Sequence, residues 1–408
     1  MRAGLRVLFC FLLGCALPAA SPGAVEPGPL AQVLGLREAS LLVEEGGVAV
    51  IARQADQPRV PASTMKLLTA LAAIERWGLE HRFETDLYRA DDGRLWVRGS
   101  GDPFLVSEDL DRLALEVKAR GLDRVAGIGT DSTRYAAGLD IPGRSASDNP
   151  YDAPLSALAV NFNTLHVLRT RGGVQSAEEQ TPLTALAAEL GRELPPGKHR
   201  VNLRDGEAAA RYFAELLAAK LRAAGVVVGE DHRDGALPRG ARAFHRYRSG
   251  RDLGTLIASM LEYSNNFVAN GLFLALGDRG DGRPLTLEAA QEAFAAWADR
   301  RFGWRGYRVE EGAGLSRGNR LSARQLVDVL RLFAPYRELL PAQDERIRAK
   351  TGTLRGISCY AGYVQRAGRW EPFALLINQP VAYELRRQVA DSLARTPDLA
   401  RVCPGASC

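Results

Sequence analysis

The chain has 408 residues and a formal net charge of +5, and 46% of its residues are hydrophobic, as in ordinary soluble enzymes. Its length exceeds what one compact core usually holds and predicts two or three domains. Because the basic residues are spread along the sequence, we expect no nucleic-acid-binding surface, which would require a basic stripe interleaved with aromatic residues.

The first two dozen residues have the pattern of a secretory signal peptide, which we place at residues 1–24. Arg2 and Arg6 precede an apolar run from Val7 to Leu17, and small residues follow. This run is too short to span a membrane comfortably, so we expect an exported protein. The residues that end at Cys15 also resemble a bacterial lipoprotein processing site. A lipid anchor on Cys15, with peripheral membrane association, is the alternative.

Three cysteines remain after cleavage of the signal peptide: Cys359, Cys403 and Cys408. Export permits a disulfide, either between Cys403 and Cys408 or between Cys359 and one of them, and leaves one thiol free. Neither the cysteines nor the five histidines show metal-ligand spacing. We therefore predict no metal and no cofactor.

Taken in order, the residues before position 83 predict a short helix, a hairpin and an amphipathic helix. The helix falls within residues 25–38, and two strands at 41–43 and 48–51 follow it, joined by a glycine turn. From Ser63 onward, apolar residues recur at helical spacing until Gly78 ends the pattern.

Between about residues 83 and 245 the predicted strands are short and turn signals are frequent, which indicates an insert with its own small core. We expect strands at 85–88, 95–97, near 125, within 157–168, at 200–203 and at 226–228, and helices at 182–190 and 205–225.

After residue 251 the helical period returns, and the end of the chain is rich in strands. Helices are predicted at 253–276, 285–301, 322–333 and 383–394, and strands at 346–353, 358–364 and 373–377. Strands from both ends predict an α+β fold with one antiparallel sheet flanked by helices. The domains are then 25–82 with 246–402, the insert 83–245, and a tail at 403–408.

Ser63 and Lys66 lie three residues apart, on the same side of the predicted helix. Alone, this spacing is more often a helix cap followed by a solvated lysine. A serine hydroxyl needs a base, and with no histidine nearby the candidate is a neutral Lys66. Lowering a lysine pKa from about 10.4 to near 7 costs roughly 4–5 kcal/mol. Lys350 is the cation that we expect to supply part of this shift.

Two further segments contain residues that could assist catalysis by Ser63. Ser264 would relay a proton to the leaving amine, while the Asn266 amide would hold Lys66 or the substrate backbone. Lys350 begins a Lys-Thr-Gly-Thr segment on a predicted strand.

In this segment Gly352 would let the substrate backbone lie close to the strand. Lys350 and the hydroxyls of Thr351 and Thr353 would bind a terminal carboxylate. The backbone N–H groups of Ser63 and Thr353 would form an oxyanion hole.

A competing nucleophile pattern, Gly-x-Ser-x-Gly, surrounds Ser316. In α/β-hydrolases the catalytic histidine follows this serine, yet the last histidine here is His245. We therefore assign Ser316 to a tight loop beside the site.

Together the Ser-x-x-Lys, Ser-x-Asn and Lys-Thr-Gly motifs, in this order, resemble those of class C low-molecular-mass penicillin-binding proteins, the D-alanyl-D-alanine carboxypeptidase/endopeptidase family. Accessory segments carry the same resemblance: Gly101-Asp102-Pro103-Phe104, Pro154-Leu155-Ser156-Ala157, Asn161-Phe162-Asn163 and Gly312-Ala313-Gly314-Leu315-Ser316. Two departures are a middle asparagine, Asn265, where many relatives have aspartate, and a shorter chain between residues 163 and 198. We expect the middle side chain to point away from substrate.

The resemblance implies a penicillin-binding/transpeptidase-like domain with an inserted β-rich subdomain, a periplasmic location, and peptidoglycan stem peptides as substrate. It also implies that β-lactams acylate Ser63. The implied roles are Ser63 as nucleophile, Lys66 as base, Ser264 and Asn266 as second motif, and Lys350 with Thr351 on the binding strand. The expected activity is that of a serine DD-peptidase, as carboxypeptidase, endopeptidase or both. The alternatives are a serine β-lactamase or a non-catalytic peptidoglycan-binding relative.

Overall fold

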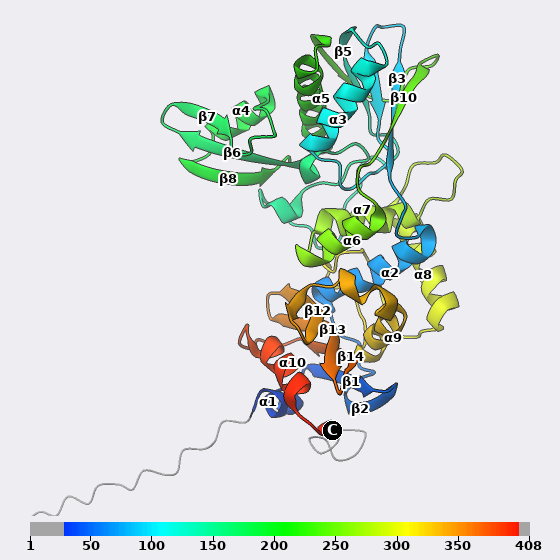
Figure 1. Ribbon diagram of the computed structural model, residues 1–408, viewed down its shortest axis with the longest axis vertical. Coiled ribbons are helices and arrows are strands. Elements are labelled where there is room, and N and C mark those ends of the chain that lie inside the picture. The colour runs from blue at the N-terminus through cyan, green and yellow to red at the C-terminus, as the bar shows by residue number, and fades with distance from the viewer. Residues whose placement is uncertain (1–27, 400–408) are drawn as a thin grey trace, which may run out of the picture.

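The computed structural model describes residues 28–399. Its two parts lie one above the other along the long axis, and the first and last described residues are at the lower end (Figure 1). The predicted signal peptide, Cys15, Cys403 and Cys408 lie outside the described residues. Cys359 is a free, buried thiol. Within residues 28–399 no helix has the length and apolar character needed to cross a membrane.

A six-stranded antiparallel sheet organises the lower part, and it combines strands from both ends of the chain, as predicted. Its order is β11-β12-β13-β14-β1-β2. The register pairs Ala39 with Ile377 and Lys350 with Ala361. The strands are β1 (Ala39–Glu45), β2 (Val48–Arg53), β11 (Ala342–Asp344), β12 (Ile347–Leu354), β13 (Ile357–Arg366) and β14 (Arg369–Ile377).

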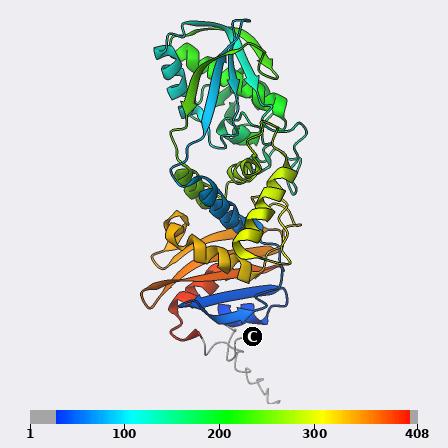
Figure 2. The same cartoon turned by 90° about the vertical axis from the view of Figure 1, so that its right-hand side faces the viewer.

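Helices cover both faces of this sheet, and Figure 2 shows the layers edge on. One face packs against α1 (Pro29–Gly35) and α10 (Leu385–Arg395). The other bears the larger core, formed with α2 (Lys66–Trp77), α6 (Leu253–Glu262), α7 (Asn266–Leu276), α8 (Leu287–Phe302) and α9 (Ala323–Phe333). Helix α2 is buried along residues 66–74, whereas Ser63, just before the helix, is half-buried.

The insert has a five-stranded sheet of order β10-β3-β4-β5-β9 and a three-stranded sheet of order β7-β6-β8, which projects to one side (Figure 1). The strands are β3 (Glu84–Arg89), β4 (Leu95–Arg98), β5 (Arg124–Asp131), β6 (Thr164–Thr170), β7 (Gly173–Ser176), β8 (Gly197–Asn202), β9 (Val227–Asp234) and β10 (Arg242–Arg248). The helices are α3 (Ser107–Ala119), α4 (Ala185–Arg192) and α5 (Gly206–Ala223). The domain limits at 83 and 245 stay a prediction.

Helix α3 was absent from the sequence-based prediction, and the pairing of the insert strands explains why it is needed. β4, β5 and β9 are parallel neighbours. Parallel strands require a crossover connection, usually a helix, rather than a tight turn. Helix α3 supplies the crossover from β4 to β5, and α5 precedes β9 on the same core.

Candidate active site

Ser63 lies in a 3₁₀ turn, Ala62–Met65, that leads directly into α2. The predicted start of an α-helix is therefore wound more tightly than expected. In a 3₁₀ turn, residues three apart eclipse one another. This brings Lys66 Nζ to 3.1 Å from Ser63 Oγ, within hydrogen-bonding distance.

The Lys66 amine is fully buried and has two further oxygen partners. It donates to Asn266 Oδ1 at 2.8 Å and to the Ala313 carbonyl at 2.8 Å. Burial, and after it the positive charge of Lys350, holds the Lys66 pKa well below its usual value, while Glu311 acts in the opposite direction. Burial is thus the larger cause, and Lys350, which we expected to supply part of the shift, is the second.

The number of partners matters because an ammonium has three donors and no acceptor. The two carbonyl oxygens of Asn266 and Ala313 can only accept hydrogen bonds. A neutral amine, with two N–H groups and a lone pair, would satisfy both and still accept the Ser63 proton. The geometry therefore suits a lysine that acts as a base.

The loop that offers the Ala313 carbonyl is folded around the buried Glu311 carboxylate. Glu311 accepts hydrogen bonds from the backbone N–H groups of Ala313 and Gly314, both at 2.8 Å, and from the Asn319 amide at 2.7 Å. A Cβ on Gly314, whose φ is +82°, would lie 1.9 Å from the Ala62 carbonyl oxygen. Only glycine fits this contact between the loop and the serine turn.

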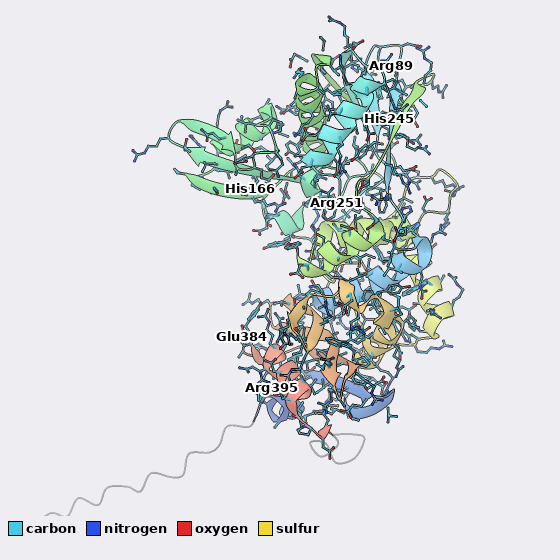
Figure 3. All side chains as sticks on the ribbon, in the orientation of Figure 1. Arg89, His166, His245, Arg251, Glu384 and Arg395 are labelled. Carbon is cyan, nitrogen blue, oxygen red and sulfur yellow. The ribbon has the colours of Figure 1, made fainter. Side chains whose placement is uncertain are left out.

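Ser316, the competing nucleophile, is buried in the same loop. Its Oγ donates to the Glu310 carboxylate and accepts from the Gly318 N–H at 2.9 Å. Two of the histidines, His166 and His245, lie in the insert (Figure 3). There they contact Glu178 at 3.3 Å and Glu116 at 2.8 Å, respectively. None of these contacts gives Ser316 a histidine base.

The second motif forms the turn between α6 and α7. Ser264 has a φ of +53°, and its hydroxyl has no hydrogen-bond partner among residues 28–399. Asn265 caps α7, because its Oδ1 accepts from the Val268 N–H at 3.1 Å. Aspartate and asparagine are nearly equivalent at a helix N-cap. This explains how Asn265 can occupy the middle position while Asn266 turns back toward Lys66.

Strand β12 passes directly beside the serine turn. A Cβ on Gly352 would lie 2.8 Å from the Pro61 carbonyl oxygen and 3.1 Å from the Ser63 nitrogen. Lys350 is 1% exposed, and its amine donates to the Thr351 carbonyl at 3.0 Å. Burial and the charge of Arg386 lower the Lys350 pKa to about 8.

Arg386, on α10, is a site residue that sequence reasoning missed. Its guanidinium is buried under β12 and donates from Nη1 to the Gly352 carbonyl at 3.1 Å and to Thr353 Oγ1 at 2.6 Å. The face of Tyr383 lies 4.7 Å from it. The sequence offers little signal, because residue type alone does not separate Arg386, on the buried side of α10, from the many other arginines of the chain.

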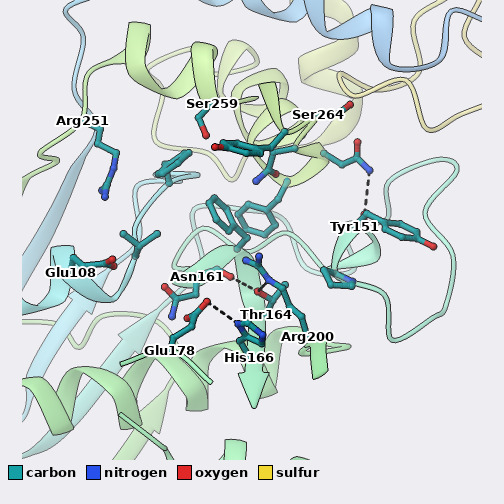
Figure 4. Close-up of a pocket in the computed structure, with 18 of the residues that line it drawn as sticks. Glu108, Tyr151, Asn161, Thr164, His166, Glu178, Arg200, Arg251, Ser259 and Ser264 are labelled. Atoms are coloured by element: carbon teal, nitrogen blue, oxygen red, sulfur yellow. Dashed lines mark hydrogen bonds and ion pairs between the residues drawn. The ribbon is translucent and has the colours of Figure 1, made fainter. Parts of the chain in front are cut away.

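The Ser264–Asn266 turn also forms one wall of a cavity of about 540 Å³ between α6, α7 and the insert (Figure 4). The Asn266 amide nitrogen donates across this boundary to the Tyr151 carbonyl at 3.5 Å. Among residues 28–399, no group of three or more histidine, cysteine or acidic side chains is placed to hold a metal ion.

Sequence comparison identifies the family. The profile described as D-Ala-D-Ala carboxypeptidase 3 (S13) matches residues 40–189 and 194–344. A D-alanyl-D-alanine carboxypeptidase of Actinomadura sp. (strain R39) is 26% identical over 396 residues, which cover 78% of this chain and 73% of the relative.

Solved structures share the fold. Penicillin binding protein 4 (dacB) from Haemophilus influenzae superposes with a TM-score of 0.71 at 20% identity, over 87% of this chain and 95% of that one. The same protein complexed with a novel β-lactam gives a TM-score of 0.66, with the same identity and coverage. A predatory peptidoglycan endopeptidase from Bdellovibrio bacteriovorus gives 0.52 at 15% identity, over 87% and 90% of the two chains.

Proposed function

The chain belongs to the D-Ala-D-Ala carboxypeptidase 3 (S13) family, and we propose that this serine D-Ala-D-Ala peptidase acts on peptidoglycan stem peptides through an acyl-enzyme on Ser63. The observation that carries the proposal is the buried Lys66 amine, 3.1 Å from Ser63 Oγ, with two carbonyl oxygens as its other partners. These contacts support a neutral amine that takes the serine proton.

Acylation would proceed in two proton transfers. Lys66 accepts the Ser63 proton as Oγ attacks the carbonyl carbon of the penultimate D-alanine. The backbone N–H groups of Ser63 and Thr353 hold the oxyanion that forms. When the C–N bond breaks, the leaving amine takes the proton from Lys66 through Ser264. Water then hydrolyses the ester, with Lys66 again as base.

Lys350 would bind the substrate carboxylate together with the hydroxyls of Thr351 and Thr353. Arg386 supports this role for Thr353, because Thr353 Oγ1 accepts a hydrogen bond from the guanidinium. A hydroxyl that accepts from a cation keeps its own proton to donate. The carboxylate is the natural acceptor of that proton. The space left by the missing Cβ of Gly352 is taken by the serine turn rather than by substrate.

Two further proposals concern inhibitors and location. β-Lactams would acylate Ser63 because they imitate the D-Ala-D-Ala end. The signal-peptide pattern at residues 1–24 supports export to the periplasm, with a lipid anchor on Cys15 as the alternative.

The direct test is labelling with fluorescent penicillin. We expect a covalent adduct on the wild type and none on Ser63→Ala, whereas Ser392→Ala, a serine change near the C-terminal end of α10, should label normally. Loss of labelling in Lys66→Ala with unchanged melting temperature would support the base role. A wild type that forms no adduct would refute the proposal.

Carboxypeptidase and endopeptidase activities use the same residues and need a separate assay. Release of D-alanine from a pentapeptide, compared with cleavage of cross-linked dimers, measures each activity. A rapid loss of the penicillin adduct would instead favour β-lactamase activity.

A further inference from the structure

Glu311 is a fully buried carboxylate that takes no part in the bond changes at Ser63. We propose that it is a positioning residue for acylation: it fixes the Ala313 carbonyl against Lys66 and supplies the negative charge that stabilises the ammonium formed when Lys66 takes the Ser63 proton. This inference rests on the proposed function and assigns a role to a residue outside the three active-site motifs.

The hydrogen-bond partners of Glu311 show that its carboxylate is ionised. It accepts from the N–H groups of Ala313 and Gly314 at 2.8 Å and of Ser316 at 3.2 Å, and from the Asn319 amide at 2.7 Å. Every partner is a donor, and an ionised carboxylate has only acceptors to offer them. Within residues 28–399 no lysine, arginine or histidine forms an ion pair with Glu311. Neutral donors alone therefore hold this negative charge in place.

The loop around Glu311 is attached to both catalytic helices. The Thr69 hydroxyl, one turn after the catalytic lysine on α2, donates to the Gly312 carbonyl at 2.7 Å. The Gly312 N–H donates to Asn270 Oδ1 on α7 at 2.7 Å. Because the loop is fixed to α2 and α7 at this glycine, the hydrogen bond from Ala313 N–H to Glu311 orients the next carbonyl. That carbonyl, of Ala313, faces the catalytic amine at 2.8 Å.

The charges that act on the Lys66 amine oppose one another. Burial and the positive charge of Lys350 lower its pKa, whereas the negative charge of Glu311 raises it. Helix α7 has no charged residue, and α2 has none between Lys66 and Glu75. Of the elements packed against the amine, β12 with Lys350 and the loop with Glu311 therefore supply the charges that set its proton affinity.

The proton transfer explains why an anion is useful at this position. Before the attack, the lone pair of a neutral Lys66 faces Ser63 Oγ at 3.1 Å. When the proton moves, the O–H bond breaks, a third N–H bond forms on Nζ, and the amine gains one positive charge. Its other two N–H groups stay on Asn266 Oδ1 and the Ala313 carbonyl. The opposite charge of Glu311 is already in place, so its stabilising effect requires no reorganisation during the reaction.

The experiment measures the second-order rate constant of acylation by fluorescent penicillin between about pH 4 and 9. In the wild type the rate should fall at low pH as Lys66 becomes protonated. In Glu311→Gln we expect the midpoint of this acid limb to lie about one pH unit lower, because the ammonium loses its counter-charge. One pH unit is a tenfold change in proton affinity, so the rate above the midpoint should fall by up to about tenfold.

Glu310→Gln is the matched control, because it removes the neighbouring carboxylate of the same loop. Glu310 accepts from the Ser316 hydroxyl and pairs with Arg308 at 2.7 Å, so its variant should keep the wild-type acid midpoint. The alkaline limb is a second control. It follows Lys350, whose pKa is about 8, and should not move in Glu311→Gln.

A second variant is needed because the Glu311→Gln amide would face the Ala313 N–H, and melting temperatures show whether this variant folds. If it does not, Asn270→Asp carries the test. It keeps the acceptor for the Gly312 N–H and adds an anion beside the same loop, so its acid midpoint should lie above that of the wild type.

An acid midpoint that stays at the wild-type value in folded Glu311→Gln would overturn the inference, because a purely structural role would lower the rate equally at every pH. Equal shifts in Glu311→Gln and Glu310→Gln, or an unmoved midpoint in Asn270→Asp, would overturn it as well. A wild type that forms no adduct at any pH would instead refute the proposed function.

Discussion

Replacement of Arg386 by glutamine tests whether the positive charge of Arg386 contributes to binding of the substrate carboxylate. The change removes a buried cation while it keeps an amide donor near β12. Arg386 Nη1 lies 2.6 Å from Thr353 Oγ1, and a substrate carboxylate would add an ordinary hydrogen bond of about 2.7 Å. The guanidinium and the carboxylate would thus be about 5 Å apart.

Two unit charges at about 5 Å attract by about 1–3 kcal/mol for effective dielectric constants of about 80 down to 20. At neutral pH we therefore expect KM for a D-Ala-D-Ala peptide to rise about 5- to 150-fold in Arg386→Gln. The C-terminal amide of the same peptide lacks the charge, so its KM should change little.

Arg386→Gln should also change the pH at which affinity for the substrate carboxylate is lost. Burial and Arg386 lower the Lys350 pKa to about 8, so the wild type loses the Lys350 charge, and with it carboxylate affinity, as the pH rises through that value. Without Arg386 the Lys350 pKa rises, and the variant should keep this component of affinity to higher pH.

The assay is kcat/KM between pH 6 and 10 for the carboxylate and amide substrates. Arg387→Gln, at the next and more exposed position on α10, is the control. Melting temperatures show whether both variants fold. Equal losses on the two substrates, or an unmoved pH midpoint, would refute the reasoning.

Three further predictions concern the frame of the site. Gly314→Ala places a Cβ 1.9 Å from the Ala62 carbonyl oxygen at a φ of +82°, so thermal denaturation should show a loss of about 2–4 kcal/mol, and penicillin acylation should slow. Asn265→Asp should keep the α7 cap and change stability little, whereas Asn265→Ala should cost about 1 kcal/mol in urea unfolding; equal effects would contradict the cap. Burial raises the Asp102 pKa from 3.8 to about 7, so its contribution favours folding at low pH and is lost as pH rises from 4 to 7. Asp102→Asn should therefore stabilise the protein at pH 8 but not at pH 4, and an equal effect at both would exclude this explanation.

The sequence predicted the parts of the fold that depend on local patterns. The hairpin, α2 and the three C-terminal strands follow from apolar spacing and turn residues, and their assembly into one sheet follows from the need to bury both faces. Helix α3 was missed even though Leu110, Leu113 and Val117 have helical spacing. Only the parallel pairing of β4 and β5 makes that crossover necessary, and pairing is a non-local property.

For the site, the side-chain motifs were visible but their surroundings were not. Ser63 and Lys66 are three residues apart, so their contact could be predicted from helix geometry. The contact between Lys66 and the Ala313 carbonyl could not be predicted, because a backbone group has no sequence signal. This carbonyl faces Lys66 only because the loop folds around Glu311. Arg386 was hidden for a related reason: burial, rather than residue type, distinguishes it from the other arginines.

The pairing of β1 with β14 has a consequence for how the enzyme is made. Ala39 is opposite Ile377, so the first strand to leave the ribosome must wait for a partner synthesised 338 residues later (377 − 39 = 338). Such distant contacts slow folding, and an unpaired strand edge invites aggregation in the interval. The insert, whose contacts are closer in sequence, can fold during this wait. Activity should therefore appear only after the chain is complete through β14.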